Sequence, residues 1–182
     1  MHEELIFAGF GGQGVLFAGQ LLAYTALAEG KHVTWIPSYG PEMRGGTANC
    51  TVILSDDPIG SPVSQHPSIV VVFNHPSLDK YEDQIRPGGL LVVNASLTMR
   101  DPERDDIDRA LLPATELATA LGNPRVANMV LLGALLVHRP IVAQDTIARV
   151  LATKLGPAKT DLCALDLRAL ERGMAVAQEQ HA

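Results

Sequence analysis

The sequence has few aromatic residues, few cysteines and no excess of positive charge. Aromatic residues make up 4% of its 182 residues, so it lacks the rings on which single-stranded nucleic acid could stack. The formal net charge of −6 also disfavours a polyanionic partner. The two cysteines, Cys50 and Cys163, lie far apart, and neither has a C-x-x-C neighbour. We therefore expect no nucleic-acid partner and no zinc or iron–sulfur site built by this chain alone.

The sequence also lacks a long hydrophobic run, and we expect no targeting leader. The longest apolar stretch, Val126–Val137, is interrupted by polar Asn128 and is shorter than the roughly 20 residues that span a bilayer. Met1–Glu4 leads directly into the first expected strand, without a basic or cleavable apolar segment. These features predict a cytoplasmic protein without a membrane partner. The length and the 47% hydrophobic content predict one domain over residues 1–182 that buries its own core.

A glycine-rich turn lies between the first expected strand, Leu5–Ala8, and the first expected helix, Val15–Gly30. Its glycines have the G-x-G-x-x-G spacing of dinucleotide-binding turns. Glycine permits positive φ and a close approach to a ligand, and the amino end of the following helix attracts anions. Tight packing of helix on strand, without a ligand, is the alternative. The candidate binding residues of the turn are Gly11, Gly12, Gln13 and Gly14.

The second expected strand, His32–Ile36, is not followed by the acidic residue that NAD-binding units place there, which disfavours an NAD-dependent oxidoreductase. A second glycine-rich segment, Tyr39–Gly46, follows instead. The first two strand-to-helix loops of a doubly wound sheet open at one edge, so we expect both glycine-rich segments to face one crevice. The candidates from this second region are Ser38, Tyr39, Gly40, Glu42, Arg44 and Gly45.

Several of these polar candidates have two interpretations. The Arg44 guanidinium suits phosphate or carboxylate binding, but Glu42 and Arg44 equally suit a salt bridge to another subunit. Asn74 and Asn94 end two expected strands at the edge where ligands bind, although asparagine is also a common turn residue. Asn128 interrupts an apolar helix and needs a partner, which a loop carbonyl or a ligand could supply.

The remaining pattern predicts a three-layer α/β/α fold with a mostly parallel, Rossmann-like sheet. Ile69–Phe73 and Leu90–Val93 are continuous apolar runs typical of buried parallel strands. The charged stretch 97–112 reads as a solvated loop and short helix. The first helix is nearly uncharged until its end, so part of its surface is expected to meet another subunit. Later helices are expected over 115–121, 126–137, 143–155 and 165–178.

The two glycine-rich motifs, Gly9–Val15 and Tyr39–Gly46, together resemble the gamma subunit of the 2-oxoacid:ferredoxin oxidoreductases. Asn128–Ala134 is similar to the C-terminal helix of that family, so the resemblance covers nearly the whole chain. Overall similarity is greatest to the gamma subunit of the 2-oxoglutarate enzyme. Such complexes, of the EC 1.2.7 type, oxidatively decarboxylate a 2-oxoacid, such as 2-oxoglutarate or pyruvate, to its acyl-CoA.

The resemblance implies a division of labour. Thiamine diphosphate, the iron–sulfur clusters and the 2-oxoacid pocket are implied to lie on partner subunits, alpha and beta, with a ferredoxin-like delta subunit as a further candidate and ferredoxin as electron acceptor. This chain is implied to have no catalytic residue or metal, to support the complex and to share in binding coenzyme A. The rival interpretation, from a different class, is a free-standing nucleotide-binding or regulatory α/β module.

Overall fold

The computed structural model describes residues 1–39 and 46–181. It forms one six-stranded sheet in the order β2-β3-β1-β4-β5-β6. The strands are β1 (His2–Phe10), β2 (His32–Tyr39), β3 (Thr47–Ser55), β4 (Ile69–Val72), β5 (Leu90–Asn94) and β6 (Asp108–Leu112). The α-helices are α1 (Val15–Ala28), α2 (His75–Tyr81), α3 (Ala114–Ala120), α4 (Ala127–His138), α5 (Gln144–Leu155) and α6 (Thr160–His181).

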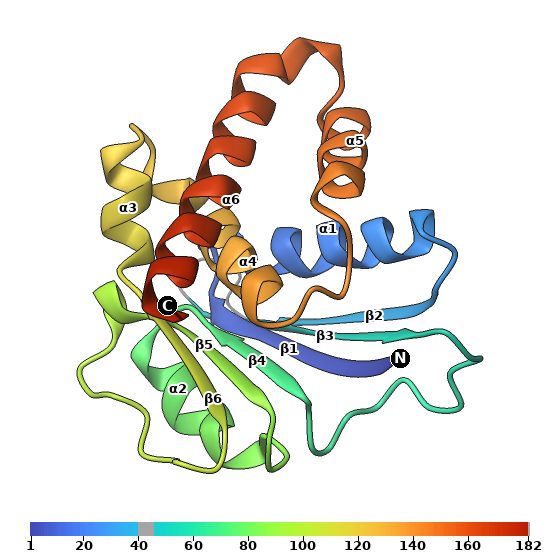
Figure 1. The fold of residues 1–182 in the computed structure, drawn as a ribbon, viewed down its shortest axis with the longest axis vertical. Coiled ribbons are helices and arrows are strands. Elements are labelled where there is room, and N and C mark those ends of the chain that lie inside the picture. The colour runs from blue at the N-terminus through green and yellow to red at the C-terminus, as the bar shows by residue number, and fades with distance from the viewer. Residues whose placement is uncertain (40–45, 182) are drawn as a thin grey trace.

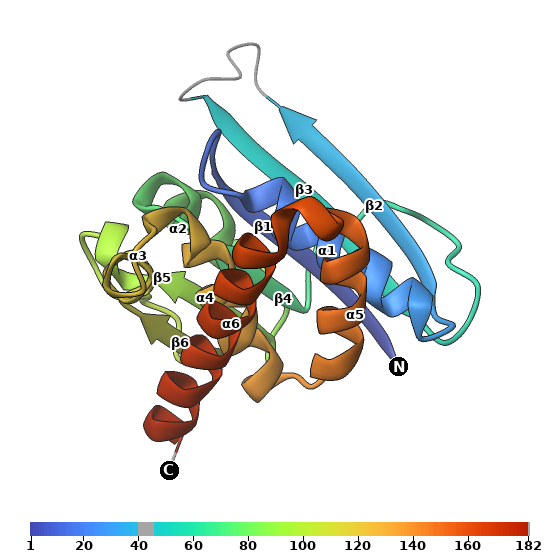
Figure 2. The ribbon, with the colours of Figure 1, turned by 90° about the horizontal axis from the view of Figure 1, so that it is seen from above.

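The sheet has helices on both faces, as Figure 1 shows, with α1, α4, α5 and α6 on one side and α2 on the other. Seen from above in Figure 2, α5 lies between α1 and α6. The pairs β1–β4, β4–β5 and β5–β6 are parallel, and only β3 runs against its neighbours. The predicted three-layer, mostly parallel fold is therefore confirmed.

The central strands are apolar on both faces because both faces are covered. Every residue of β4 has no exposed surface. Alternate side chains point to opposite layers, so that Val71 joins the core beneath α1 and α4 while Val70 packs with Leu78 and Tyr81 of α2. Each such fully buried aliphatic side chain contributes about 1.5–3 kcal/mol through burial, which is what holds the layers together.

Helix α4 is buried almost all round, because it lies between the sheet and α6. The two helices approach closely at Gly133 and Gly173, where an added Cβ would collide with the backbone of the facing helix at Leu170 and Val130 respectively. The interrupted apolar run of the sequence is thus an interior helix. Asn128–Ala134, the stretch similar to the C-terminal helix of the family, lies in α4, and two further helices, α5 and α6, follow it as expected.

The expectation of a solvated loop and short helix over 97–112 was wrong for its last residues, which form a strand. This stretch contains strand β6, which pairs with β5, and the segment before it is anchored on Glu82, only 3% exposed. Glu82 accepts hydrogen bonds from the backbone amides of Glu103 and Arg104 at 2.5 and 3.0 Å and from the Arg100 guanidinium at 2.8 Å. Burial opposes ionisation, but these bonds outweigh it and lower the pKa of Glu82.

We had expected the second glycine-rich segment to connect a strand to a helix, and this expectation was wrong. It joins β2 to the antiparallel strand β3 as a hairpin connection. Since β3 is antiparallel to both β2 and β1, those two strands run in the same direction and their carboxyl ends still lie at one edge of the sheet. The final helix also differs from expectation, because α6 begins at Thr160 rather than at Leu165.

Candidate functional site

The candidate site lies at the carboxyl edge of β1, β4 and β5. The chain leaves β1 through α1 on one face of the sheet and leaves β4 through α2 on the other, as Figure 1 shows. Neighbouring parallel strands with connections that diverge in this way leave a crevice between their carboxyl ends, which is where open α/β sheets bind ligands.

The glycine turn has the backbone conformation that its sequence requires. Gly12 and Gly14 have φ of 91° and 75°, in the left-handed region that favours glycine. At Gly14 a side chain is excluded for a second reason, because an added Cβ would lie 2.5 Å from Nδ2 of Asn128. The turn is joined to the start of β3 by a 2.9 Å hydrogen bond from the Gly11 amide to the Gly46 carbonyl.

Gln13 fastens the turn to the neighbouring strand. Its Oε1 accepts hydrogen bonds from the backbone amide of Phe10 at 2.7 Å and from Nδ2 of Asn74 at 3.1 Å. The other amide atom of Asn74, Oδ1, accepts from the backbone amide of Ser77 at 3.0 Å and so caps α2. One buried asparagine therefore ties the glycine turn to the amino end of α2.

Asn94 and Asn128 are also hydrogen-bonded within the chain. Asn94 is 2% exposed, and its Nδ2 donates to the Phe73 carbonyl at 3.3 Å and to Oγ1 of Thr115 at 2.9 Å. Nδ2 of Asn128 donates to the carbonyl of Gly14 at 3.2 Å. Asn74 and Asn94 thus lie at the edge where we expected them, and the partner of Asn128 is a loop carbonyl, one of its two expected partners.

Two cavities open on either side of the turn and share Gly12. One, of about 360 Å³, lies between the turn and the start of β3; the other, of about 220 Å³, lies over the ends of β4 and β5. The residues that line the first are Phe10, Gly11, Gly12, Gly14, Val15, Leu16, Phe17, Gly46, Thr47 and Ala48. Those that line the second are Gly12, Gln13, Phe73, Asn94, Leu97, Thr115, Pro124, Arg125 and Ala127.

These linings suit the binding of an anion better than catalysis. Among the described residues that line them, Arg125 is the one charged side chain, and no cysteine, histidine or carboxylate is present. The amides at the start of α1 precede its first helical hydrogen bond, from the Ala18 amide to the Gly14 carbonyl at 3.0 Å, and point toward the turn. The described lining residues therefore offer hydrogen-bond donors and a guanidinium, but no carboxylate, histidine or cysteine that could serve as general acid, general base or nucleophile.

The candidates of the second glycine-rich region are only partly placed. Ser38 is exposed near the end of β2, opposite Asn49 in the register of the sheet, and Tyr39 ends the strand opposite Ala48. Ser38 is not among the residues that line the two cavities. Gly40, Glu42, Arg44 and Gly45 lie outside the described residues.

Thr115 and Arg125 were missed at the level of sequence. Thr115 lies at the start of α3, directly after β6. Because β6 contains charged residues, its sequence was interpreted as a loop, and the start of α3 was not assigned to the carboxyl edge of the sheet. Arg125 follows Asn123-Pro124, where Oδ1 of Asn123 accepts from the Arg125 amide at 3.0 Å. That Asn-Pro signal marks a helix start and could have placed Arg125 near the other helix amino ends.

The cysteines do not fit a metal cluster. Cys50 lies in β3 with no exposed surface, and its burial raises the pKa of the thiol to about 12, which makes it a poor metal ligand. Cys163 lies on α6 and is half-buried. In the part of the chain that the structure describes, no three His, Cys, Asp or Glu side chains gather as a metal site would require. Within those same residues, no helix is long and apolar enough to cross a membrane.

Comparison with known proteins identifies the family. The family model described as "Pyruvate ferredoxin/flavodoxin oxidoreductase" matches residues 4–176. The chain is 35% identical to 2-oxoglutarate synthase subunit KorC of Methanocaldococcus jannaschii, covering 98% of this chain and 96% of that protein. It is 42% identical to ketoisovalerate oxidoreductase subunit VorA of Methanothermobacter marburgensis over 71% of this chain, but it spans only 27% of that protein's length.

A solved structure supports the same assignment. The gamma subunit of the keto/oxoacid ferredoxin oxidoreductase from Geobacter sulfurreducens superposes with a TM-score of 0.82 at 28% identity, covering 97% of this chain and 99% of that one. The family resemblance carried by the two glycine-rich motifs is therefore confirmed. The chain belongs to the pyruvate ferredoxin/flavodoxin oxidoreductase family.

Proposed function

We propose that this chain is the gamma subunit of a 2-oxoacid:ferredoxin oxidoreductase complex whose substrate is 2-oxoglutarate. The observation that carries the proposal is the end-to-end match to KorC, in which each protein covers nearly all of the other. In the overall reaction, the 2-oxoacid, coenzyme A and two oxidised ferredoxins give the acyl-CoA, carbon dioxide, a proton and two reduced ferredoxins. The electrons come from cleavage of the bond between the two carbonyl carbons.

The role of this chain in that reaction is support and binding. Thiamine diphosphate and the iron–sulfur clusters belong to the partner subunits, since the cysteines here do not fit a cluster and the described lining residues of the carboxyl edge offer no acid or base. The amides of Gly12 and the first turn of α1, with Arg125, are donors suited to a phosphate group of coenzyme A.

The edge also fits coenzyme A better than NAD. The residues that line its two cavities in the described part of the chain include no carboxylate to hold ribose hydroxyls, which agrees with the missing acidic residue after β2. Coenzyme A binding by this edge has a direct test. In the assembled complex, Arg125→Ala should raise the KM for coenzyme A about three- to tenfold with little change in kcat, because an exposed guanidinium contributes modestly. Arg125→Lys is the matched control and should retain most of the affinity.

The substrate is tested by an assay on the complex co-purified with this chain. Coenzyme A-dependent reduction of a low-potential acceptor should be fastest with 2-oxoglutarate, measured against pyruvate and ketoisovalerate. Ketoisovalerate is the second candidate, because the match to VorA has the higher identity, 42%. Recovery of the chain alone, inactive with all three acids, would instead support a free-standing nucleotide-binding module.

A further inference from the structure

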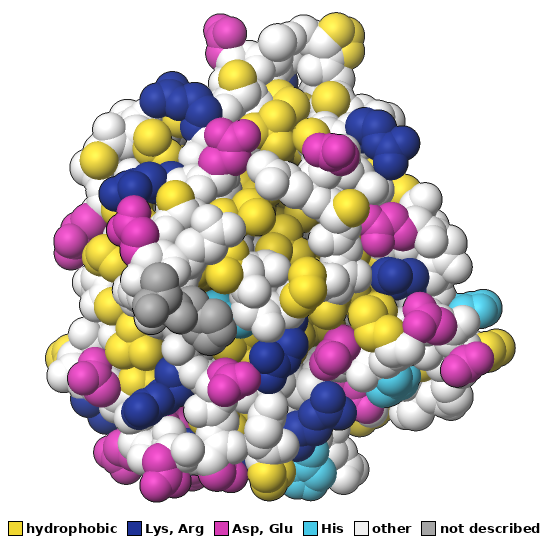
Figure 3. Space-filling view, viewed as in Figure 1, with side chains coloured by type: hydrophobic (Ala, Val, Ile, Leu, Met, Phe, Trp, Pro, Cys, Tyr) yellow, Lys and Arg dark blue, Asp and Glu magenta, His cyan; other side chains and the backbone are white. Residues whose placement is uncertain are grey.

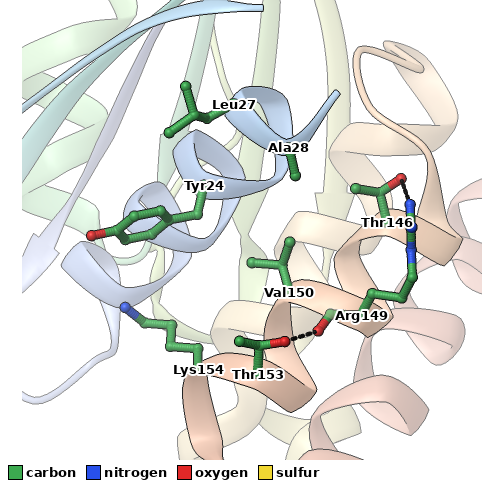
Figure 4. A pocket seen from close by; sticks show the side chains of 8 residues that line it. All are labelled: Tyr24, Leu27, Ala28, Thr146, Arg149, Val150, Thr153 and Lys154. Carbon is green, nitrogen blue, oxygen red and sulfur yellow. Dashed lines mark hydrogen bonds between the residues drawn. The ribbon is translucent and has the colours of Figure 1, made fainter. Parts of the chain in front are cut away.

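An apolar groove runs between the facing sides of α1 and α5. The α1–α5 groove has a volume of about 550 Å³, and its walls include Tyr24 and Leu27 of α1 and Val150 of α5. Tyr24 and Leu27 are 49% and 57% exposed, which is unusual for large apolar side chains standing together on a helix. In Figure 4, Ala28 of α1 and Val150 of α5 lie between the two helices, Tyr24 extends above Lys154, and Leu27 points away from α5 at the rim.

The groove continues across α1 onto the edge of the sheet. A second hollow of about 200 Å³ is lined by the same Tyr24 and Leu27 together with Val33 and Trp35 of β2. On the face shown in Figure 3, hydrophobic side chains form a band down the middle, in the region of α5 and α6. Because the two hollows share Tyr24 and Leu27, the apolar surface that they form is contiguous.

Helix α1 explains why this surface is apolar. Its fourteen residues include no charged side chain, whereas a helix that faces water normally carries a charged stripe. Its buried side packs on the sheet through Val15, Ala18, Leu22 and Ala26. The exposed side is left with Tyr24 and Leu27. The sequence of α1 is therefore that of a helix covered on both sides.

The rim of the groove carries two cations, Lys154 and Arg149, for which the described part of the chain supplies no acidic partner. Nζ of Lys154 bonds to Oε1 of Gln20 and lies 5.0 Å from the centre of the Tyr24 ring, and partial burial lowers the pKa of Lys154. Arg149 donates to Oγ1 of Thr146 at 3.2 Å, as Figure 4 shows. Neither takes part in an ion pair among the described residues, and no described residue that lines the groove is acidic.

We propose that the α1–α5 groove is the surface on which this chain docks with a subunit of its own complex, through an apolar segment that carries a carboxylate. The docking subunit is the one equivalent to the remainder of VorA, the longer relative of which this chain spans 27%. In that relative the corresponding domain is part of one longer polypeptide, so it has a permanent neighbour. The inference rests on the proposed function, because it takes the chain to be a subunit.

The positive charges at the groove favour a different, carboxylate-bearing subunit over a second copy of this chain. A two-fold dimer through the groove would bring Lys154 and Arg149 of one copy toward the same cations of the other, with no acidic side chain among the described lining residues to separate them. A carboxylate from a different subunit would instead pair with Lys154 and also reverse the cost of its partial burial.

The test uses the full-length chain co-expressed with the other subunits of its complex, with assembly measured by native mass spectrometry and by titration of the purified chain into the remaining subunits. We expect Leu27→Glu and Lys154→Glu each to weaken assembly at least tenfold, and the double variant to abolish it, while the isolated variants melt at the wild-type temperature. The matched controls, Val63→Glu at a 66% exposed apolar site and Lys159→Glu on the turn before α6, should assemble normally.

A photo-crosslinking residue at position 27 identifies the occupant. We expect a crosslink to the subunit equivalent to the remainder of VorA. A crosslink between two copies of this chain, or normal assembly of the double variant, would overturn the docking surface while leaving the proposed function intact. A wild-type chain that joins no complex and supports no 2-oxoacid oxidation would overturn both.

Discussion

The carboxyl edge of the sheet and the helical layer of α1, α5 and α6 differ in whether their polar groups are paired and their apolar side chains are buried within the chain. At the edge, Gln13, Asn74, Asn94 and Asn128 are all hydrogen-bonded within the chain. In the helical layer, large apolar side chains are exposed, two cations lack acidic partners among the described residues, and Asp166 is 5% exposed without a hydrogen bond or ion pair in that set. The edge is built to be complete in the isolated chain, whereas the helical layer is not.

The largest expected loss of stability comes from a substitution at Gly14, in the glycine turn at the carboxyl edge. Gly14→Ala should lower the free energy of unfolding by roughly 2–4 kcal/mol, because φ is 75° and the new Cβ would press on Asn128. Gly12→Ala has the same conformational problem but no atom within 4 Å of the new Cβ, so its cost should be near 1 kcal/mol. Urea denaturation measures both, and equal losses would show that the contact with Asn128 is unimportant.

The next effect concerns the unpaired carboxylate in the helical layer. Burial raises the pKa of Asp166 to about 6, so the fold favours the neutral acid. Its contribution to stability is fully present below the unfolded-state pKa, about 4, and is lost as the pH rises toward 6. Asp166→Asn should therefore stabilise the isolated chain at pH 7 by up to roughly 2 kcal/mol and flatten the melting temperature between pH 4 and 6.

The control for this pH dependence is Glu171→Gln, at an exposed position in the interior of the same helix. It should leave the melting curve and its pH dependence unchanged. Wild-type behaviour of Asp166→Asn across pH 4 to 7 would mean that the Asp166 carboxylate is solvated.

A smaller effect is expected at the asparagine that ties the edge together. Asn74→Ala removes the cap of α2 and the hydrogen bond to Gln13, and should cost about 1–2 kcal/mol in the free energy of unfolding. Asn74→Asp keeps the capping oxygen but loses the donor to Gln13, and should cost less. If both variants unfold at the same urea concentration, the bond to Gln13 rather than the cap dominates.

The smallest effect should be found in the groove. Leu27→Ala in the isolated chain should change the free energy of unfolding by no more than about 0.5 kcal/mol, since the side chain is 57% exposed. Thermal unfolding of the free chain measures this. A loss of several kcal/mol in the free energy of unfolding would show that Leu27 packs in the core of the chain and is not part of an exposed docking surface.

Most of the fold follows from local patterns in the sequence. The buried runs of β4 and β5, the glycine turn and the helix periodicity each depend on neighbouring residues, which is why their positions were predicted well. Strand β6 was missed because its residues, Asp108 and Arg109, are charged and exposed on a strand at the end of the sheet. The antiparallel β3 was misread because nothing in a short strand's own sequence states which way it runs.

The site was predictable in position but not in detail. Gln13, Asn74 and Asn94 were found because they end strands or follow a glycine turn, and polar residues in those places meet at one edge. Their partners within the chain could not be predicted, since hydrogen bonds such as that from Asn94 to Thr115 join segments distant in sequence. Arg125 was missed because the helix-start signal of Asn123-Pro124 was overlooked, and its closeness to Gly12 also depends on packing between distant segments.

The most direct measurement is side-chain footprinting of this chain, free and within its purified complex, with a carbene or hydroxyl-radical label. We expect assembly to protect Tyr24 and Leu27 strongly from labelling. Val63, an exposed apolar residue outside the groove, should be labelled as strongly in the complex as in the free chain. Equal labelling of Tyr24 and Leu27 in the free and assembled chain would contradict the claim that the helical layer is completed by a partner.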